Sequence, residues 1–282
     1  MRNSRTLLNE LCSEKLLSNW VTPYTIFSSR RKINLAVQDL LSQSLSHLPQ
    51  RQLSILDVGT YYGGMIFYFL NKYPHLTFHG IDVDSHKIHY AQDLLKEIKN
   101  PALRRNITFS THNIEDRPLD SRYDVVLCVE TIEHVHHVDR ALAHIYKSLQ
   151  PGGYFILSTP NKQNSLKRFI PFRKKVKTHI EEQDPVKEGY AVAENLFGVH
   201  IPNVDGDQHW SVMSLCELCS HLKQAGFAIE KVRRGPLLFG GTFFDQHSFL
   251  FALLNIFDEF LNFLPFWKTF SYDFIILAKK LK

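Results

Sequence analysis

From residue 53 to residue 158, short apolar runs alternate with segments in which apolar residues recur every three or four positions. The runs predict buried strands and the recurring pattern predicts amphipathic helices, so their alternation indicates a doubly wound α/β sheet. Strands are predicted at 54–58, 76–81, 107–110, 123–129, 154–158, 227–233 and 272–278. Helices are predicted at 65–72, after an N-cap at Ser85, at 138–149 with a stop at Pro151-Gly152-Gly153, and from the capping box Ser214-Leu-Cys-Glu217 to Ala225.

Three segments lie outside this alternation. Leucines at helical spacing predict that residues 1–50 form an N-terminal helical cap, which precedes a sheet domain over residues 51–282. Residues 162–206 and 235–270 interrupt the sheet pattern and are predicted to be insertions. A basic run with interleaved aromatic residues, 167–177, lies in the first of them.

Composition sets bounds on this outline. With 282 residues, 44% of them hydrophobic, and a net charge of +5, the chain predicts a packed core and permits an anionic partner without requiring one. Cys12, Cys128, Cys216 and Cys219 make no disulfide framework at this length. Neither a signal peptide nor a transmembrane run is evident, which predicts a cytoplasmic protein.

The segment Ile55-Leu-Asp-Val-Gly-Thr-Tyr-Tyr-Gly-Gly64 places an acid and a glycine turn after the first predicted strand. A glycine turn lets the backbone approach a ligand closely and aims the amino end of the next helix at it. Asp82 ends the second strand, where a carboxylate is able to accept both hydroxyls of a ribose. The spacing predicts a nucleoside pocket, with a plain strand–helix turn as the structural alternative. Because no Gly-x-Gly-x-x-Gly is present, a dinucleotide is disfavoured.

The turn resembles motif I of the class I S-adenosylmethionine-dependent methyltransferases, many of which carry glycine where this chain has Tyr61. Catechol-type O-methyltransferases are similar in having a Gly-x-Tyr-x-Gly turn. Residues 123–135 and 149–161, and then His209 ahead of residues 218–227, follow in the order that this superfamily uses. The resemblance implies a Rossmann-like seven-stranded sheet in the order 3-2-1-4-5-7-6, with strand 7 antiparallel.

The same resemblance implies which residues bind S-adenosylmethionine. The backbone amides of residues 59–63 are expected to meet the methionine end, and Asp57 to hold its ammonium. Asp82 is expected to bind the ribose hydroxyls, Val83 to pack on the adenine, and Asn113 to accept from the adenine edge, unless it belongs to a solvated loop. The full expected set is Asp57, Gly59, Thr60, Tyr61, Gly63, Asp82, Val83, Asn113, Ile114 and Glu130.

Glu130-x-x-Glu133-His134 resembles the Glu-x-x-Glu-His of two groups, the ubiquinone-biosynthesis O-methyltransferases and the metal-dependent small-RNA 2′-O-methyltransferases. One interpretation is a divalent cation such as Mg²⁺, bound by Glu130, Glu133, His134 and His209, that lowers the pKa of an acceptor hydroxyl. A second interpretation makes His134 or His209 a general base without a metal. In both, Glu133, His134 and His209 form the catalytic group. A third gives Glu133 and His134 a structural role only.

These features predict a methyltransferase that acts on a hydroxyl of a small or lipid-like acceptor. RNA 2′-O-methylation is the first alternative, favoured by the basic run 167–177, which a solvated lid also explains. A non-catalytic module that binds S-adenosylmethionine is the second alternative. A homodimer and a peripheral membrane contact both stay open.

The apolar stretch from Ser248 to Trp267 carries its polar residues at 255, 258, 259 and 262. This spacing places them on one stripe of a helix and leaves a wide apolar face that includes Phe257 and Phe260. Anionic lipid would repel Asp258 and Glu259 on the polar stripe. The pattern therefore predicts that the apolar face is buried within the protein or at a dimer seam, in preference to a membrane surface.

Overall fold

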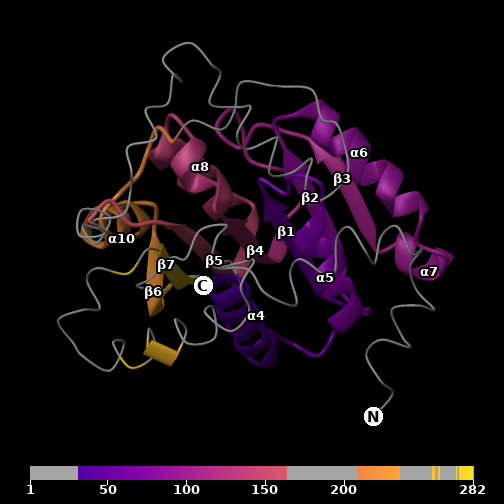
Figure 1. The fold of residues 1–282 in the computed structure, drawn as a ribbon, viewed down its shortest axis with the longest axis horizontal. Helices are drawn as coiled ribbons and strands as arrows, with labels where there is room; N and C mark the ends of the chain where they lie inside the picture. The colour runs from indigo at the N-terminus through magenta and orange to yellow at the C-terminus, as the bar shows by residue number, and fades with distance from the viewer. Residues whose placement is uncertain are drawn as a thin grey trace.

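Seven strands of the chain form one mixed sheet in the order β3-β2-β1-β4-β5-β7-β6 (Figure 1). The computed structural model describes residues 31–163, 209–235, 256–257, 260, 271 and 273–281. Strand β7 is antiparallel to both of its neighbours, β5 and β6, and the other neighbouring pairs are parallel. The predicted strand order and the predicted antiparallel strand are confirmed.

Most elements lie close to their predicted bounds, but β5 is longer than the strand predicted at 154–158. The strands are β1 Ser54–Val58, β2 Thr77–Asp82, β3 Ile107–Thr111, β4 Tyr123–Val129, β5 Leu149–Pro160, β6 Phe227–Arg234 and β7 Asp273–Lys280. The helices are α4 Arg31–Ser46, α5 Gly64–Lys72, α6 Ser85–Lys96, α7 Pro101–Arg104, the 3₁₀ helix η2 Ile132–His134, α8 Val138–Lys147 and α10 Leu215–Gln224.

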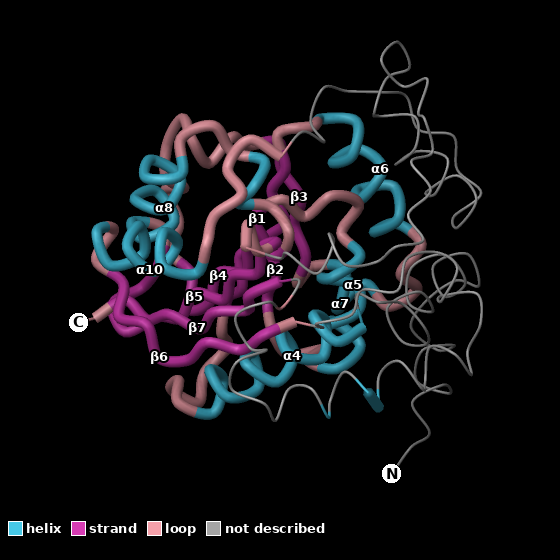
Figure 2. The backbone as a smooth tube through the Cα atoms, turned by 60° about the vertical axis from the view of Figure 1, so that its left-hand side comes forward, coloured by secondary structure: helices cyan, strands magenta, loops and turns pink. Residues whose placement is uncertain are grey.

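Helices cover both faces of the sheet, which explains why its central strands are apolar throughout. Helices α4, α5 and α6 contribute to one hydrophobic cluster, and α8 and α10 contribute to a second. Figure 2 shows α8 and α10 on one side of the strands and α4 and α5 on the other. Residues 123–128 of β4 are all buried, as expected for a strand between two helical layers.

Two local predictions need correction. The helix predicted at 138–149 ends at Lys147, because strand β5 already begins at Leu149 and pairs there with Tyr123. The register shift that follows accommodates the Pro-Gly-Gly segment inside β5, so that segment does not terminate a helix. The N-cap of α6 is Asp84 and not Ser85, because the Asp84 side chain accepts hydrogen bonds from two backbone amides of the first turn.

Helix α4 is the described part of the predicted N-terminal cap, and it shares the main core. Val37, Leu40 and Leu41 are completely buried, and they belong to the same cluster as Ile275 and Leu277 of β7. This helix therefore packs on the sheet itself. Residues 1–30 lie outside the described residues, and the division of the chain at residue 50 stays a prediction.

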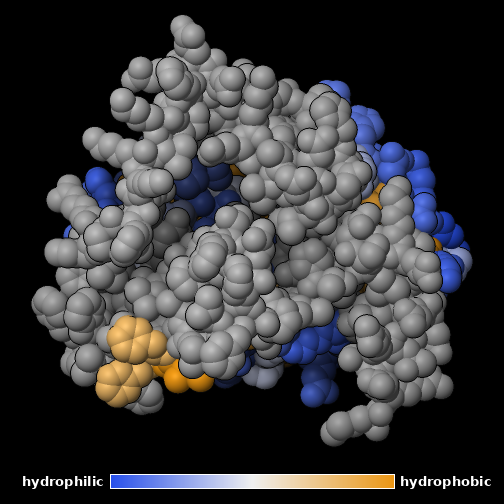
Figure 3. Space-filling view, in the orientation of Figure 1, coloured by the Kyte–Doolittle hydropathy of each residue, from blue (hydrophilic) through white to orange (hydrophobic). Residues whose placement is uncertain are grey.

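The two predicted insertions fall largely outside the described residues, and so does the whole basic run 167–177. In the second insertion, Phe257 is 54% exposed and Phe260 is 63% exposed. Apolar surface is visible at that place, at the lower left of Figure 3. The described part of the chain therefore does not cover these two rings, and their burial within the protein or at a dimer seam stays a prediction. In the described part of the chain, no helix is both long and apolar enough to span a membrane.

Candidate active site

The glycine turn between β1 and α5 depends on positive φ angles, which glycine adopts without strain. Gly59 has a φ of +72° and Gly63 a φ of +80°. A Cβ atom at Gly59 would lie 2.3 Å from the Thr131 side chain, and one at Gly63 would lie 2.6 Å from the ring of Phe109. The two glycines therefore have two effects. Their positive φ angles shape the turn, and their lack of a Cβ atom leaves room for the side chains of Thr131 and Phe109.

Tyr61 has a φ of +55° in the same turn, although it is not glycine. This conformation costs an ordinary residue on the order of 1–2 kcal/mol. The Tyr61 amide donates to Asp82 Oδ2 at 2.9 Å, and the Tyr61 and Tyr62 ring centroids lie 4.0 Å apart. Lys87 Nζ lies 4.4 Å from the centroid of the Tyr61 ring. These contacts offset the strain and explain how a tyrosine occupies a position where many superfamily members have glycine.

Several amides of the turn donate hydrogen bonds within the protein. The amides of Gly59 and Thr60 both donate to the Ile81 carbonyl, at 2.8 and 2.9 Å, and the Gly63 amide donates to the Thr60 carbonyl at 2.9 Å. The expectation that these amides bind the methionine end of a ligand is corrected accordingly. These hydrogen bonds hold Gly59, Thr60 and Gly63 in a fixed turn.

Asp57 lies near the carboxyl end of β1, beside this turn, and is only 3% exposed. Its Oδ2 accepts a hydrogen bond of 2.7 Å from Thr60 Oγ1. Burial raises the pKa of Asp57 to about 7, while the Thr60 hydrogen bond lowers the pKa and the nearby Asp82 raises it. A carboxyl group with such a pKa responds strongly to a cationic ligand group, which favours its ionised form.

Asp82 ends β2, and the parallel pairing of β1 with β2 places it beside the turn. Its two carboxylate oxygens accept hydrogen bonds from the amides of Tyr61 and Asp84, at 2.9 and 3.0 Å. These bonds orient the carboxylate, and each oxygen has further capacity to accept from a hydroxyl. Val83 follows directly and is 64% exposed. The carboxylate of Asp82 fits the hydroxyls of a ribose, and the exposed side chain of Val83 fits the flat face of an adjacent base.

The loop after β3 is organised by hydrogen bonds and is not merely solvated. Asn113 Oδ1 accepts from the Glu115 amide at 3.0 Å and has a second lone pair, so its expected role as an acceptor for the adenine edge stays a prediction. The Glu115 carboxylate accepts from the amides of His136 and His137, at the amino end of α8. Ile114 is 5% exposed, so a ligand would meet its backbone and not its side chain.

Glu130 follows β4 directly and adopts a φ of +51°. Its Oε1 accepts a hydrogen bond of 2.7 Å from Ser158 Oγ, and its amide donates to Ser158 Oγ at 3.1 Å. The left-handed conformation turns the chain sharply at the strand end, so that η2 packs against β5. Glu130 is therefore a turn residue that is hydrogen-bonded to Ser158 of the neighbouring strand β5.

Glu133, His134 and His209 meet beside this turn. Each offers one ligand atom, and these three atoms all lie within 4.8 Å of one another. Glu133 is 1% exposed, and its Oε1 lies 4.0 Å from His134 Nε2. In the described part of the chain, this group comprises three of the four predicted metal ligands, and Glu130 lies outside it. The predicted catalytic group is thus brought together in space.

Two hydrogen bonds donated by Ser211 explain how His209, 75 residues beyond His134 in the sequence, reaches this place. The Ser211 amide donates to the Glu133 carbonyl at 2.9 Å, and Ser211 Oγ donates to the Val135 carbonyl at 2.7 Å. The ring centroids of His134 and His209 lie 4.8 Å apart at an interplanar angle of 77°. The chain before α10 is therefore held against the loop after β4.

Sequence reasoning assigned no role to Thr159, whose Oγ1 donates to Glu133 Oε2 at 3.0 Å. The available signal was the Ser158-Thr159 pair, two hydroxyl residues near the end of an otherwise apolar buried strand. Cys128 lies close by, and burial raises the pKa of its thiol well above the usual value, as do the charges of Glu133, Asp57 and Glu130. Cys128 is therefore a neutral thiol and not a nucleophile.

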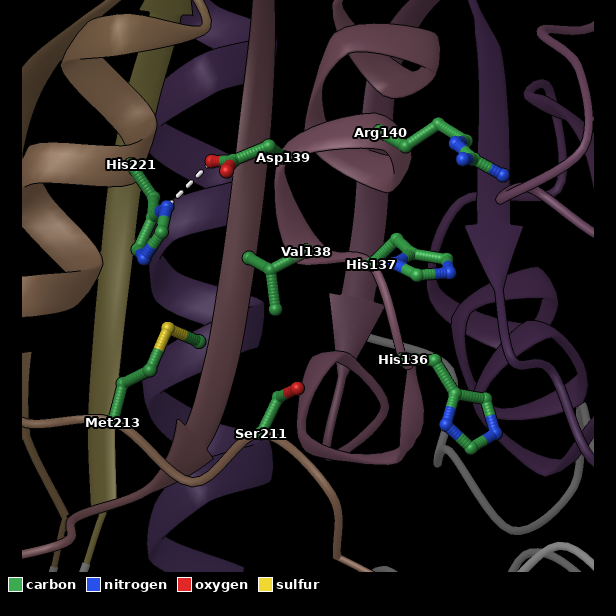
Figure 4. A pocket seen from close by; sticks show the side chains of 8 residues that line it. All are labelled: His136, His137, Val138, Asp139, Arg140, Ser211, Met213 and His221. Atoms are coloured by element: carbon green, nitrogen blue, oxygen red, sulfur yellow. Dashed lines mark hydrogen bonds and ion pairs between the residues drawn. The ribbon is translucent and has the colours of Figure 1, made fainter.

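An open pocket of about 500 Å³ lies at the amino end of α8. Figure 4 shows His136, His137 and Arg140 on one side of it and His221 and Met213 on the other. His221 Nδ1 and Asp139 Oδ1 are 2.5 Å apart across the pocket. His136 and His137, which follow the catalytic group in the sequence, are both exposed.

A family model described as "Methyltransferase domain" matches residues 29–232 of the chain. Curated relatives named ubiquinone biosynthesis O-methyltransferase include one from Candida albicans, 32% identical over 116 residues, and one from Rickettsia akari, 30% identical over 154 residues. A third, from Mus musculus, is 29% identical over 201 residues. The alignments cover 41%, 53% and 67% of this chain but only 35%, 58% and 53% of those relatives.

Solved structures share the fold at low sequence identity. One is a putative sarcosine dimethylglycine methyltransferase from Galdieria sulphuraria, with a TM-score of 0.55 and 14% identity over 88% of this chain and 84% of that one. Another is the magnesium protoporphyrin IX methyltransferase from Synechocystis with bound SAH, with a TM-score of 0.52 and 15% identity over 89% of this chain and 84% of that one. The [4+2]-cyclase SpnF is similar too, with a TM-score of 0.56 and 15% identity over 95% of both chains. Such likeness shows the fold alone.

Proposed function

Because the chain belongs to the methyltransferase-domain family, we propose that it transfers the methyl group of S-adenosylmethionine to a hydroxyl oxygen of a small or lipid-like acceptor. The observation that carries this proposal is the convergence of Glu133, His134 and His209 beside the strand ends at which a nucleoside pocket is predicted. The curated relatives support oxygen as the acceptor atom, since they are named O-methyltransferases.

The residues at the ends of β1 and β2 fit the methyl donor. The oriented carboxylate of Asp82 and the exposed Val83 suit a ribose and an adenine. Asp57 provides a buried carboxylate for the donor's ammonium. S-adenosylmethionine supplies an electrophilic methyl on sulfur, so the protein's main task is to align donor and acceptor. The rigid turn at Gly59 and the left-handed turn at Glu130 bring the two sides of the site together.

On the acceptor side, the donor atoms of Glu133, His134 and His209 fit a divalent metal ion. Two imidazoles with one carboxylate are typical ligands of first-row transition ions, whereas Mg²⁺ prefers a shell of oxygen atoms. A bound ion supplies a Lewis acid that lowers the pKa of the acceptor hydroxyl. Without an ion, His134 or His209 would take the hydroxyl proton, and the buried carboxylate of Glu133 would stabilise the resulting imidazolium.

Methyl transfer to a simple catechol tests the proposal and decides between these routes. We expect the purified protein to transfer an isotope-labelled methyl from S-adenosylmethionine to 3,4-dihydroxybenzoate. A chelator is expected to remove the activity, and Mn²⁺ to restore it better than Mg²⁺. Full activity in chelator would leave the histidines as the base. Binding of S-adenosylmethionine without methyl transfer to the catechol or to acceptors in a cell extract would favour a non-catalytic binding module.

The affinity for S-adenosylmethionine is expected to rise with pH and to level off above about pH 7, the pKa of Asp57. Below that pH the carboxyl is protonated, so binding of the donor's ammonium must release a proton, and affinity falls by up to about tenfold per pH unit. Calorimetry in buffers of different ionisation enthalpy measures this release. In the matched variant Asp57→Asn the affinity should be weaker and should lose the pH dependence. A proton release that persists in Asp57→Asn would assign it to another group.

The alternative acceptor, RNA, rests on the basic run 167–177, which lies outside the described residues. No support for it comes from the names of the three relatives above. The Candida albicans and Mus musculus relatives are named as mitochondrial and the Rickettsia akari relative is bacterial, so the cytoplasmic location of this chain stays a prediction.

A further inference from the structure

Ser158 and Thr159, consecutive residues near the end of β5, each hold one of the two glutamates of the Glu-x-x-Glu-His segment. Both hydroxyl residues are completely buried. Ser158 Oγ donates to Glu130 Oε1 at 2.7 Å, and Thr159 Oγ1 donates to Glu133 Oε2 at 3.0 Å. A buried hydroxyl in a sheet is unfavourable unless it is hydrogen-bonded. The two carboxylates therefore satisfy the hydroxyls of Ser158 and Thr159, and the hydroxyls in turn donate to the carboxylates.

The Ser158 contact is reciprocal and acts on the backbone as well as on the side chain of Glu130. The Glu130 amide donates both to Ser158 Oγ and to the Ser158 carbonyl, each at 3.1 Å. Glu130 has a φ of +51°, a conformation that persists in a non-glycine residue only where its surroundings enforce it. The Ser158 contacts provide this enforcement at the point where the chain leaves β4.

The Thr159 contact selects how the buried carboxylate of Glu133 is oriented. A threonine hydroxyl donates one hydrogen bond, and here Glu133 Oε2 accepts it. Oε1 of the same carboxylate is the oxygen that lies 4.0 Å from His134 Nε2. Rotation of the carboxylate about its last bond would break the Thr159 hydrogen bond and leave a buried charge less well satisfied, which is costly.

We propose that Ser158 and Thr159 are positioning residues for the acceptor side of the site: Ser158 fixes the turn that delivers Glu133, and Thr159 orients its carboxylate towards His134 and His209. Neither hydroxyl touches the reacting atoms. Their effect passes through the glutamates, in the way that outer hydrogen bonds orient the ligands of a metal or the side chain of a base. The expected effect on kcat rests on the proposed function. The expected effect on the orientation of the Glu133 carboxylate does not depend on that function.

The test uses Thr159→Val, which keeps the shape of the side chain and removes the hydroxyl, together with Thr159→Ser, which keeps the hydroxyl. We expect Thr159→Val to lower kcat for methyl transfer to 3,4-dihydroxybenzoate by roughly 10–100-fold, the usual effect of losing such an orienting hydrogen bond. The KM for S-adenosylmethionine should not change. Thr159→Ser should recover most of kcat, because the orienting hydrogen bond is restored. Mn²⁺ affinity, measured by electron paramagnetic resonance, should follow the same order.

Ser158→Ala tests the second contact, with Ser44→Ala as its matched control. Ser44 is also completely buried and donates to a backbone carbonyl, Leu40, on α4, away from the strand ends that form the site. Both variants lose a buried hydroxyl, but only Ser158→Ala is expected to lower kcat. Equal kcat values in the two variants would show that Ser158 serves stability alone.

Crystal structures with bound S-adenosylhomocysteine provide a readout that does not depend on activity. We expect the Glu133 carboxylate to be rotated in Thr159→Val and to be unchanged in Thr159→Ser. An unrotated carboxylate in Thr159→Val overturns the positioning role of Thr159, whatever the catechol assay shows. If the wild-type protein methylates no catechol but the rotation is seen, the proposed function fails and the positioning role stands. Should Thr159→Val not fold, Thr159→Ala carries the same comparison.

Discussion

Glu133→Gln is expected to lower kcat for methyl transfer by roughly 10²–10⁴-fold, the range associated with loss of a positioned acid or base. Glutamine keeps the volume of the buried side chain and an oxygen that accepts from Thr159. It removes the negative charge that a metal ion or an imidazolium needs beside it. His134→Ala should cause a comparable loss. Calorimetric titration with S-adenosylmethionine should give unchanged affinity in both variants, because neither residue lies at the ribose or the adenine.

His137→Ala is the matched control for His134→Ala. The His137 side chain is exposed at the rim of the neighbouring pocket and is not part of the group formed by Glu133, His134 and His209. Its removal should leave kcat unchanged. Full activity in both Glu133→Gln and His134→Ala would contradict the catalytic role of the group. Loss of cofactor binding together with activity would point to a structural role instead.

Asp82→Ala is expected to weaken S-adenosylmethionine binding by about 10–100-fold, which corresponds to roughly 1–3 kcal/mol for buried hydrogen bonds. The physical reason is the loss of the ribose hydroxyl bonds and of the two amide bonds that hold Tyr61 and Asp84. Calorimetry with S-adenosylhomocysteine should show an equal loss, since this product has the same ribose but no positive sulfur. Wild-type affinity in Asp82→Ala would refute the assignment.

Two further measurements separate ribose binding from a damaged turn. Asp82→Asn keeps one acceptor oxygen, so its affinity should lie between those of the wild-type protein and Asp82→Ala. The thermal unfolding midpoint of Asp82→Ala should stay well above the temperature of the titration. A loss for S-adenosylmethionine but not for S-adenosylhomocysteine would mean that Asp82 acts through charge on the sulfonium and not through hydrogen bonds.

The strands were predictable because each depends on local pattern, whereas their order in the sheet was inferred from the resemblance to a methyltransferase superfamily. The apolar run 123–129 is a strand between two helical layers, and the acid–glycine turn after residue 58 follows a parallel strand, whatever surrounds them. The presence of Glu133, His134 and His209 in the catalytic group was likewise inferred from a resemblance in sequence. The surroundings of Phe257 and Phe260 were not predictable, because helical spacing shows that an apolar face exists but not what covers it.

The sequence by itself determined the strands and helices, the position of the glycine turn and the residue types available for the site, since these follow from hydrophobic periodicity and from the needs of backbone geometry. Only the tertiary structure decided how those residues are used. It showed that the Gly59 and Thr60 amides donate to the Ile81 carbonyl, that burial raises the pKa of Asp57 to about 7, and that Glu130 accepts a hydrogen bond from Ser158. Hydrogen-bond partners and burial depend on residues that are far apart in the sequence but close in space. The sequence pattern alone does not show which of these residues come together.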